Sequence, residues 1–193
     1  MTRENTFSGS KPSPIIATLS PVSMITALLA TPAPAFAQGA NPITAGAKAQ
    51  FDAVSGFVVR AAEKIPEDVY AFQPTADVRT VAQLVGHIGD GFMGMCSTAG
   101  GGKPPRTGIE KSVIGKANLV AALKEAVAYC QTVYGAMTDQ RGLESVPFYF
   151  GPSPRSAVLY FTVAHAYEHY GNLVTYMRLK NIVPPSSEPK PTK

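Results

Sequence analysis

Apolar residues recur at spacings of three and four in four segments of the chain, and no segment shows the sustained alternation of a β-strand. Spacings of three and four place apolar side chains on one face of a helix. The four segments are residues 42–64, 81–98, 116–137 and 156–180. With short to medium connections between them, they predict an all-α fold, an up-down four-helix bundle, in a domain of residues 38–183.

Residues typical of helix ends stand at the expected boundaries. Asn41 is a candidate N-cap with Pro42 at the first helical position, and Pro66 follows the end of the first segment. Thr80 is a candidate N-cap for the second helix, and the glycines of residues 100–102 are expected to end it. The capping residues and the periodicity therefore predict the same helices.

Residues 143–154 carry aromatic side chains in a stretch that cannot form a long helix. Phe148, Tyr149 and Phe150 are consecutive there, and Gly151 follows them. One interpretation is a lid over a functional site, because binding loops are often of this kind. The other is a plug that closes one end of the bundle. Both interpretations agree with the sequence.

The two ends of the chain differ in composition from the predicted bundle. Residues 1–37 contain basic residues, an apolar stretch over residues 21–29 and a small-x-small motif at residues 35–37. This order is typical of a signal peptide that is removed before Gln38, and it predicts a periplasmic or secreted protein with no stable membrane span after cleavage. A cytoplasmic extension is the alternative, because a proline interrupts the apolar stretch. Residues 184–193 predict a Pro-rich, disordered tail in solvent.

Composition narrows the class of protein further. Apolar residues make up 45% of the 193 residues and charged residues 16%, which suits a chain with a packed core rather than a disordered one. The formal net charge is +4, but it is spread along the chain without a run of Lys or Arg. The sequence therefore argues against a nucleic-acid partner.

The three histidines of the chain are candidate metal ligands. His165 and His169 lie four apart on the last long helix, so both rings project from one face, as in helices that offer two nitrogens to one ion. His87 lies midway along the second helix, beside its apolar stripe. Three protein ligands leave a coordination position open, as in catalytic metal sites. The alternative is a set of core histidines, because an HxxxH pair alone is weak evidence.

Glycines surround the histidine of the second helix. Gly86, Gly89 and Gly91 each cost about 1 kcal/mol relative to alanine inside a helix. Close approach of a neighbouring helix or a ligand is expected to offset that cost. If the second and last long helices are neighbours, the three histidine rings surround one point.

Other polar residues border the predicted site. Glu168 lies between the two histidines of the last helix, and Asp90 follows His87 by three positions. Each is either a carboxylate that orients a histidine or acts as a base, or an ordinary surface residue. Tyr176 either closes the pocket or is a core residue with its hydroxyl at an edge.

Cys96 and Cys130 are the two cysteines, and neither belongs to a metal-binding spacing. Cys96 is nine positions from His87, about 180° around a helix, so neither sulfur is expected to be a metal ligand. In an exported protein the two cysteines form a disulfide or remain small buried apolar side chains. The second and third long helices are consecutive and expected to be antiparallel, so a disulfide requires a favourable stagger between them.

Two stretches resemble the DinB-like superfamily: FQPTADVRTVAQLVGHIGD at residues 72–90, and HAYEHYGNLVTYMRLKNIVPP at residues 165–185. The likeness covers about residues 42–186. It implies a four-helix metal-binding bundle in which one histidine of the second helix and the HxxxH pair of the last long helix bind the ion. Those roles fall on His87, His165 and His169, with zinc, nickel or manganese as the expected divalent ion.

The resemblance implies one fold but more than one class of chemistry. Some relatives transfer a low-molecular-weight thiol or isomerise a substrate with glutathione or mycothiol. We therefore expect a metal-dependent enzyme, of the hydrolase or thiol-transferase type, acting on a small molecule or thiol and able to form a homodimer. The alternative is a non-catalytic, metal-binding or stress-associated exported protein.

Overall fold

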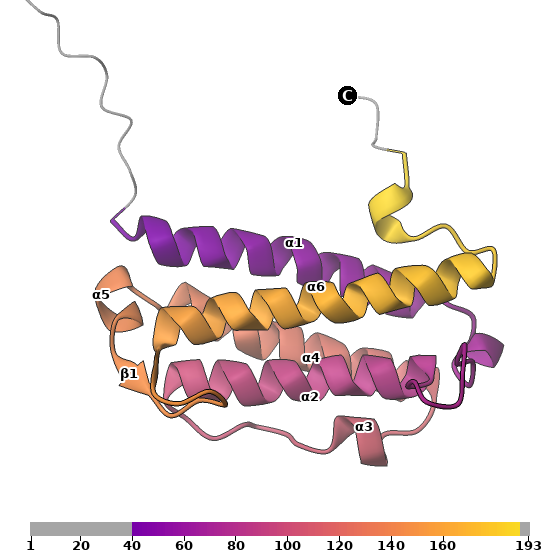
Figure 1. The fold of residues 1–193 in the computed structure, drawn as a ribbon, viewed down its shortest axis with the longest axis horizontal. Helices are drawn as coiled ribbons and strands as arrows, with labels where there is room; N and C mark the ends of the chain where they lie inside the picture. The colour runs from indigo at the N-terminus through magenta and orange to yellow at the C-terminus, as the bar shows by residue number, and fades with distance from the viewer. Residues whose placement is uncertain (1–39, 190–193) are drawn as a thin grey trace, which may run out of the picture. The chain divides into compact units, whose positions relative to one another are not determined.

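The computed structural model describes residues 40–189, which form a bundle of four long helices (Figure 1). The long helices are α1 (Pro42–Lys64), α2 (Val81–Gly100), α4 (Lys116–Gly135) and α6 (Arg155–Leu179). The shorter elements are η1 (Glu67–Val69), α3 (Ile109–Ser112), α5 (Asp139–Gly142), β1 (Ser145–Val146), β2 (Ser153–Pro154) and η2 (Pro185–Ser187). The prediction of an all-α fold with four long helices is confirmed.

The connection from α2 to α4, residues 101–115, runs back along the bundle (Figure 1). An extended chain of this length covers the roughly 30 Å of a 20-residue helix. As a result α2 and α4 run in the same direction, and α1 and α6 run in the opposite one. The Ser97 and Tyr129 hydroxyls, late in α2 and α4, are accordingly 3.0 Å apart. The order of directions therefore departs from the strict alternation expected for consecutive helices.

Aromatic side chains join the four long helices in the core. The Phe51 ring on α1 stacks on the Tyr134 ring of α4 at 4.6 Å and meets the Phe92 ring of α2 edge-on at 5.2 Å. The Tyr134 hydroxyl donates to the Leu159 carbonyl of α6 at 2.7 Å, which satisfies its polar atom inside the core. One cluster of contacts thus fixes all four helices relative to one another.

The ends of α1 and α2 are capped in different ways. Thr80 and Gln83 form the capping box of α2. The side chain of Asn41 does not cap α1; it accepts a hydrogen bond from the Asp139 N–H at 2.9 Å. The Asp139 carboxylate takes its place and accepts from the N–H groups of Ile43 and Thr44. Asn41 stands at the predicted N-cap position with Pro42 after it, but its side chain does not cap the helix, because a carboxylate from α5 reaches the free N–H groups.

Cys96 and Cys130 form a disulfide between α2 and α4, with their Cα atoms 5.4 Å apart. Of the two alternatives for these cysteines, the structure has the disulfide. The parallel course of α2 and α4 explains it, since both cysteines lie in the second half of their helices.

Residues 143–154 form a short hairpin in which Ser145 pairs with Pro154 and Val146 with Ser153. The sequence predicted no strand here, because a two-residue strand is too short to show alternation. The hairpin leads directly into α6, whose first residue, Arg155, donates from its backbone N–H to the Glu144 carbonyl.

Part of the predicted solvated tail packs against the bundle. Pro184 and Pro185 are buried, and the Tyr170 hydroxyl donates to Ser186 Oγ at 2.9 Å. The prediction is therefore wrong for this part of the tail, because η2 packs against α1 and hydrogen-bonds to Tyr170 of α6. The signal-peptide prediction concerns residues 1–37, which lie outside the described residues. Within residues 40–189, none of the helices combines the length and apolar character needed to cross a bilayer.

Candidate metal centre

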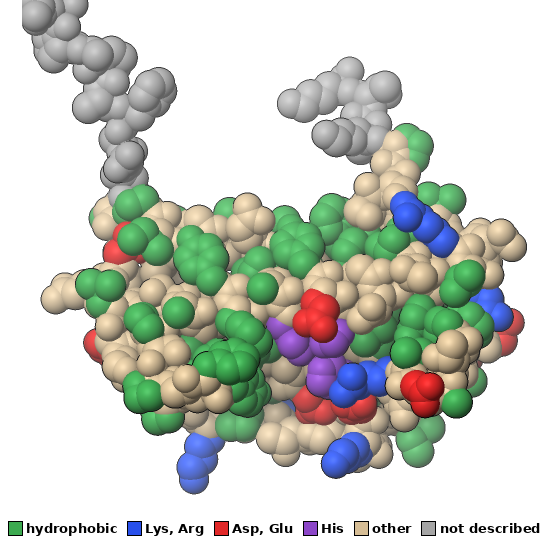
Figure 2. Space-filling view, viewed as in Figure 1, with side chains coloured by type: hydrophobic (Ala, Val, Ile, Leu, Met, Phe, Trp, Pro, Cys, Tyr) green, Lys and Arg blue, Asp and Glu red, His purple; other side chains and the backbone are tan. Residues whose placement is uncertain are grey.

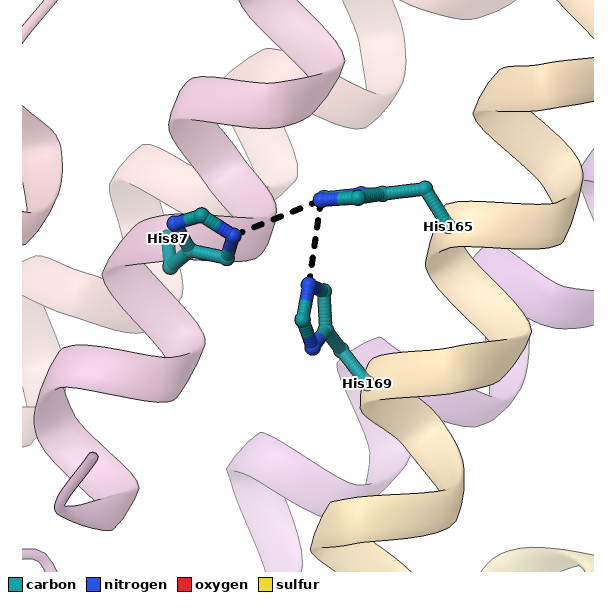
Figure 3. Close-up of side chains that lie close together, drawn as sticks. All are labelled: His87, His165 and His169. Atoms are coloured by element: carbon teal, nitrogen blue, oxygen red, sulfur yellow. Dashed lines mark hydrogen bonds between the residues drawn. The ribbon is translucent and has the colours of Figure 1, made fainter. Parts of the chain in front are cut away.

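The three predicted ligands come together between α2 and α6. His165 Nε2 lies 3.3 Å from His87 Nε2 and 3.0 Å from His169 Nε2 (Figure 3). One ligand atom from each residue lies within 4.8 Å of the others. The HxxxH spacing on α6 and the packing of α2 against α6 thus produce the constellation that the sequence predicted.

The spacing of the nitrogens fits a metal ion. Two imidazole nitrogens bound at about 2.0–2.1 Å, and separated by tetrahedral or octahedral angles, are about 2.8–3.4 Å apart. The distances from His165 Nε2 to the other two Nε2 atoms, 3.0 and 3.3 Å, lie in this interval. Three histidines at these distances could hold one divalent ion with a coordination position left for another ligand.

Burial keeps two of the rings unprotonated. Desolvation is the largest cause that lowers the pKa of His165 to about 4, and repulsion from the neighbouring histidines is the next. Desolvation is also the largest cause that lowers the pKa of His169 to about 4, and repulsion from His87 and Arg79 adds to it. Near pH 7 both rings are therefore neutral and retain a lone pair for a metal ion.

A carboxylate from α3 fixes the third ring. Glu110 Oε2 lies 3.1 Å from His87 Nδ1 and accepts a hydrogen bond from the Nδ1–H, which leaves the lone pair of Nε2 free. Arg79 Nε donates to the other oxygen of Glu110 at 2.9 Å. Asp90 accepts from the N–H groups of Ile109 and Glu110, at 2.9 Å each, and so anchors the segment that carries Glu110.

The glycines around His87 allow this close packing. A Cβ atom on Gly86 would lie 2.5 Å from the Glu110 Cα, and one on Gly91 would lie 2.7 Å from His165 Cε1. A Cβ on Gly89 would meet the Ile109 side chain at 3.0 Å. The predicted close approach is confirmed: α3 crosses α2 at two of the glycines, and a histidine ring covers the third.

His165 has a feature that argues against an ordinary core histidine. Its Nδ1 atom is buried and has no hydrogen-bond partner among the described residues. Burying an unsatisfied polar group costs about 1–3 kcal/mol. A metal ion on Nε2 would leave Nδ1 without a partner, but the free energy of metal binding would offset the cost, for which packing alone gives no reason.

A cavity of about 590 Å³ opens beside His169. Polar side chains dominate its walls, among them Arg79, Gln83, Glu168 and Asn172. Figure 2 shows histidine side chains at the surface between acidic and basic groups, with hydrophobic side chains on one flank. A small polar molecule could therefore reach the histidines from solvent.

The other candidate residues have distinct positions. Glu168 is exposed and lines the cavity. Asp90 binds backbone N–H groups of α3 and acts on His87 only through Glu110. Tyr176 lines the cavity, and its hydroxyl donates to the Arg79 carbonyl at 3.1 Å. Sequence reasoning missed Glu110, whose only signal is an acidic residue in the connection that follows α2.

The comparisons with known proteins agree with this architecture. Residues 50–173 match the DinB superfamily. None of the curated proteins matches the chain. A DinB-like protein from Bacillus subtilis is similar in structure, with 19% identity and a TM-score of 0.59 over 70% of this chain and 92% of that one. A DinB-like protein from Bacillus cereus is also similar in structure, with 16% identity and a TM-score of 0.64 over 73% of this chain and 95% of that one.

A third similar structure is the mycothiol-dependent maleylpyruvate isomerase. Its identity to this chain is 12% and its TM-score is 0.56, over 67% of this chain and 60% of that one. At these identities the solved structures show a shared fold. The family match spans most of the bundle, and the chain belongs to the DinB superfamily.

Proposed function

We propose that His87, His165 and His169 bind one divalent metal ion through their Nε2 atoms and that the protein is an exported, metal-dependent enzyme acting on a small molecule. The observation that carries the proposal is the convergence of the Nε2 atoms, at 3.0 and 3.3 Å, beside a cavity of about 590 Å³. Zinc, nickel or manganese is the expected ion.

The residues around the histidines suit activation of a nucleophile. When bound, a divalent ion with an open position lowers the pKa of a coordinated water or thiol and supplies a nucleophile near pH 7. Arg79 and Asn172 line the cavity and offer N–H donors to polar groups of a substrate. Glu168 precedes His169 in the same lining, where its carboxylate can accept the proton that the nucleophile releases.

Two reactions fit this arrangement. An activated water would make the protein a hydrolase, and an activated thiol would make it a thiol transferase. The fold shared with a mycothiol-dependent isomerase supports the thiol reaction. Export supports hydrolysis, because low-molecular-weight thiols are chiefly intracellular. The Cys96–Cys130 disulfide supports export, since disulfides persist in oxidising compartments.

Metal analysis of purified protein tests the centre. We expect about one equivalent of metal in the wild type and loss of it in His165→Ala and in His169→Ala, with helical content retained, because the core does not depend on the ion. Tyr167→Ala, an exposed residue between the two ligands, is the matched control. Stoichiometric metal in both histidine variants would contradict the proposal.

Activity assays with esters and with thiol acceptors then distinguish the reactions. Turnover that disappears with His165→Ala or His169→Ala assigns the enzyme class. Stoichiometric metal without turnover on either panel favours a non-catalytic metal-binding protein instead.

A further inference from the structure

Aromatic side chains gather where the β1–β2 hairpin meets α6. The ring centroids of Phe148, Tyr149 and Phe150 lie 5.3, 6.4 and 5.7 Å from that of Phe161 on α6. We call these four residues the aromatic cluster. Tyr149 is 74% exposed and Phe150 is 81% exposed, so the hairpin does not simply plug the end of the bundle. Exposed apolar patches of this kind mark binding surfaces.

The hairpin that carries the cluster is held in place. Its two strands pair between Ser145 and Pro154. The Arg155 side chain donates to the Glu144 carboxylate at 2.9 Å and to the Ala99 carbonyl of α2 at 2.7 Å. The base of the hairpin is therefore fixed to α2, which restricts the turn that carries the aromatic side chains and lowers the entropic cost of binding a ligand there.

The cluster is continuous with the candidate metal centre. Phe161 precedes His165 by four positions, so the two side chains share one face of α6. On α2, Gly94 follows Gly91, the glycine packed on the His165 ring, by three positions. A second cavity of about 340 Å³ is lined by Gly94, Thr98, Pro147, Phe148 and Tyr149. Figure 2 shows hydrophobic side chains directly beside the histidines.

We propose that the aromatic cluster and this second cavity bind an apolar, preferably aromatic, group of the substrate whose metal-binding atom lies at the three histidines. The inference rests on the metal centre of the proposed function. One helical turn, from Phe161 to His165, rises about 6 Å, so the ring and the metal-binding atom of the substrate are separated by few bonds. The polar cavity beside His169 takes the remainder of the substrate.

Gly94 allows a selective test. A Cβ atom built on Gly94 meets nothing within 4 Å, and Gly94 lines the second cavity, so a larger side chain at this position is expected to extend into it. Gly94→Leu therefore fills the proposed subsite and leaves the metal ligands in place. Tyr149→Ala/Phe150→Ala removes the exposed aromatic rings instead. Tyr167→Ala, an exposed aromatic residue of α6 outside the cluster, is the matched control.

Two hydroxamates, which bind metal ions through the same group, serve as probes of the metal-loaded full chain by calorimetry. We expect benzohydroxamate to bind about five- to ten-fold more tightly than acetohydroxamate, because its ring packs on the cluster. In Gly94→Leu and in Tyr149→Ala/Phe150→Ala we expect the dissociation constants of the two probes to differ by no more than about two-fold. Affinity for acetohydroxamate should stay unchanged in all three variants.

The outcomes separate this inference from the proposed function. If the protein carries metal but binds both probes equally, the subsite is wrong and the metal centre stands. If neither probe binds and no metal is retained, both proposals fail. The Tyr149→Ala/Phe150→Ala variant could instead lose self-association and keep the preference for benzohydroxamate. That result would assign the cluster to a contact between copies of the chain and would also overturn the inference.

Discussion

At the scale of residues, the carboxylate of Glu110 holds the His87 ring through its 3.1 Å contact to Nδ1. Glu110→Gln keeps the shape of the side chain but removes the charge that fixes the tautomer. We expect the affinity for divalent metal to fall about 10- to 100-fold with helical content unchanged. Competition with a chelator of known affinity measures it. Glu125→Gln, which alters the exposed ion pair with Arg106, is the control; equal affinities in Glu110→Gln and wild type would contradict this role.

The buried histidines also make the stability of the metal-free protein depend on pH. The pKa values of His165 and His169 are lowered from 6.5 to about 4 by burial, so the folded state disfavours their protonation. Their contribution to stability is therefore fully present above about pH 6.5 and is lost as the pH falls toward 4. We expect the Tm to decrease between pH 7.5 and 4.5, and to decrease less in His165→Ala/His169→Ala. Thermal unfolding measures both, and an equal decrease would contradict the assignment.

The residues of the candidate site differ in how far the sequence reveals them. His165 and His169 lie four apart on one helix, so their meeting follows from helical geometry alone. Glu110 reaches His87 across 23 positions through α3, a helix of four residues. No periodicity marks such a contact, because it depends on the path of a connection rather than on the face of a helix.

At the scale of elements, we expect alanine substitutions at two glycines of α2 to change the free energy of unfolding in opposite directions. Gly86→Ala places a Cβ 2.5 Å from the Glu110 backbone, so we expect a loss of about 1–3 kcal/mol in the free energy of unfolding. Gly94→Ala meets no atom within 4 Å and should gain up to about 1 kcal/mol, because alanine is the better helix former. Urea unfolding of both variants is the measurement. Equal effects would show that α3 does not pack on Gly86 in solution.

The helices themselves were predictable, and their directions were not. The repeat of apolar residues at three and four places each long helix within two residues of its observed ends. The direction of α4 depends on residues 101–115, which carry no apolar pattern that shows whether they turn tightly or run back along α2. The β1–β2 hairpin escaped prediction for a related reason, since its strands have only two residues each.

At the scale of the whole molecule, the parallel course of α2 and α4 and the proposed export lead to one prediction. The disulfide joins residues 34 positions apart. It lowers the entropy of the unfolded chain and so stabilises the folded state by about 3–4 kcal/mol. Expressed with its own N-terminus in a bacterial host, the protein should be exported, begin at Gln38 and contain no free thiol when denatured without reductant. Cys96→Ala/Cys130→Ala should then unfold at lower urea concentration, by about 3–4 kcal/mol in free energy, with the same helical content. Material that begins at Met1 and titrates two thiols would refute both the signal peptide and the oxidising compartment on which the disulfide depends.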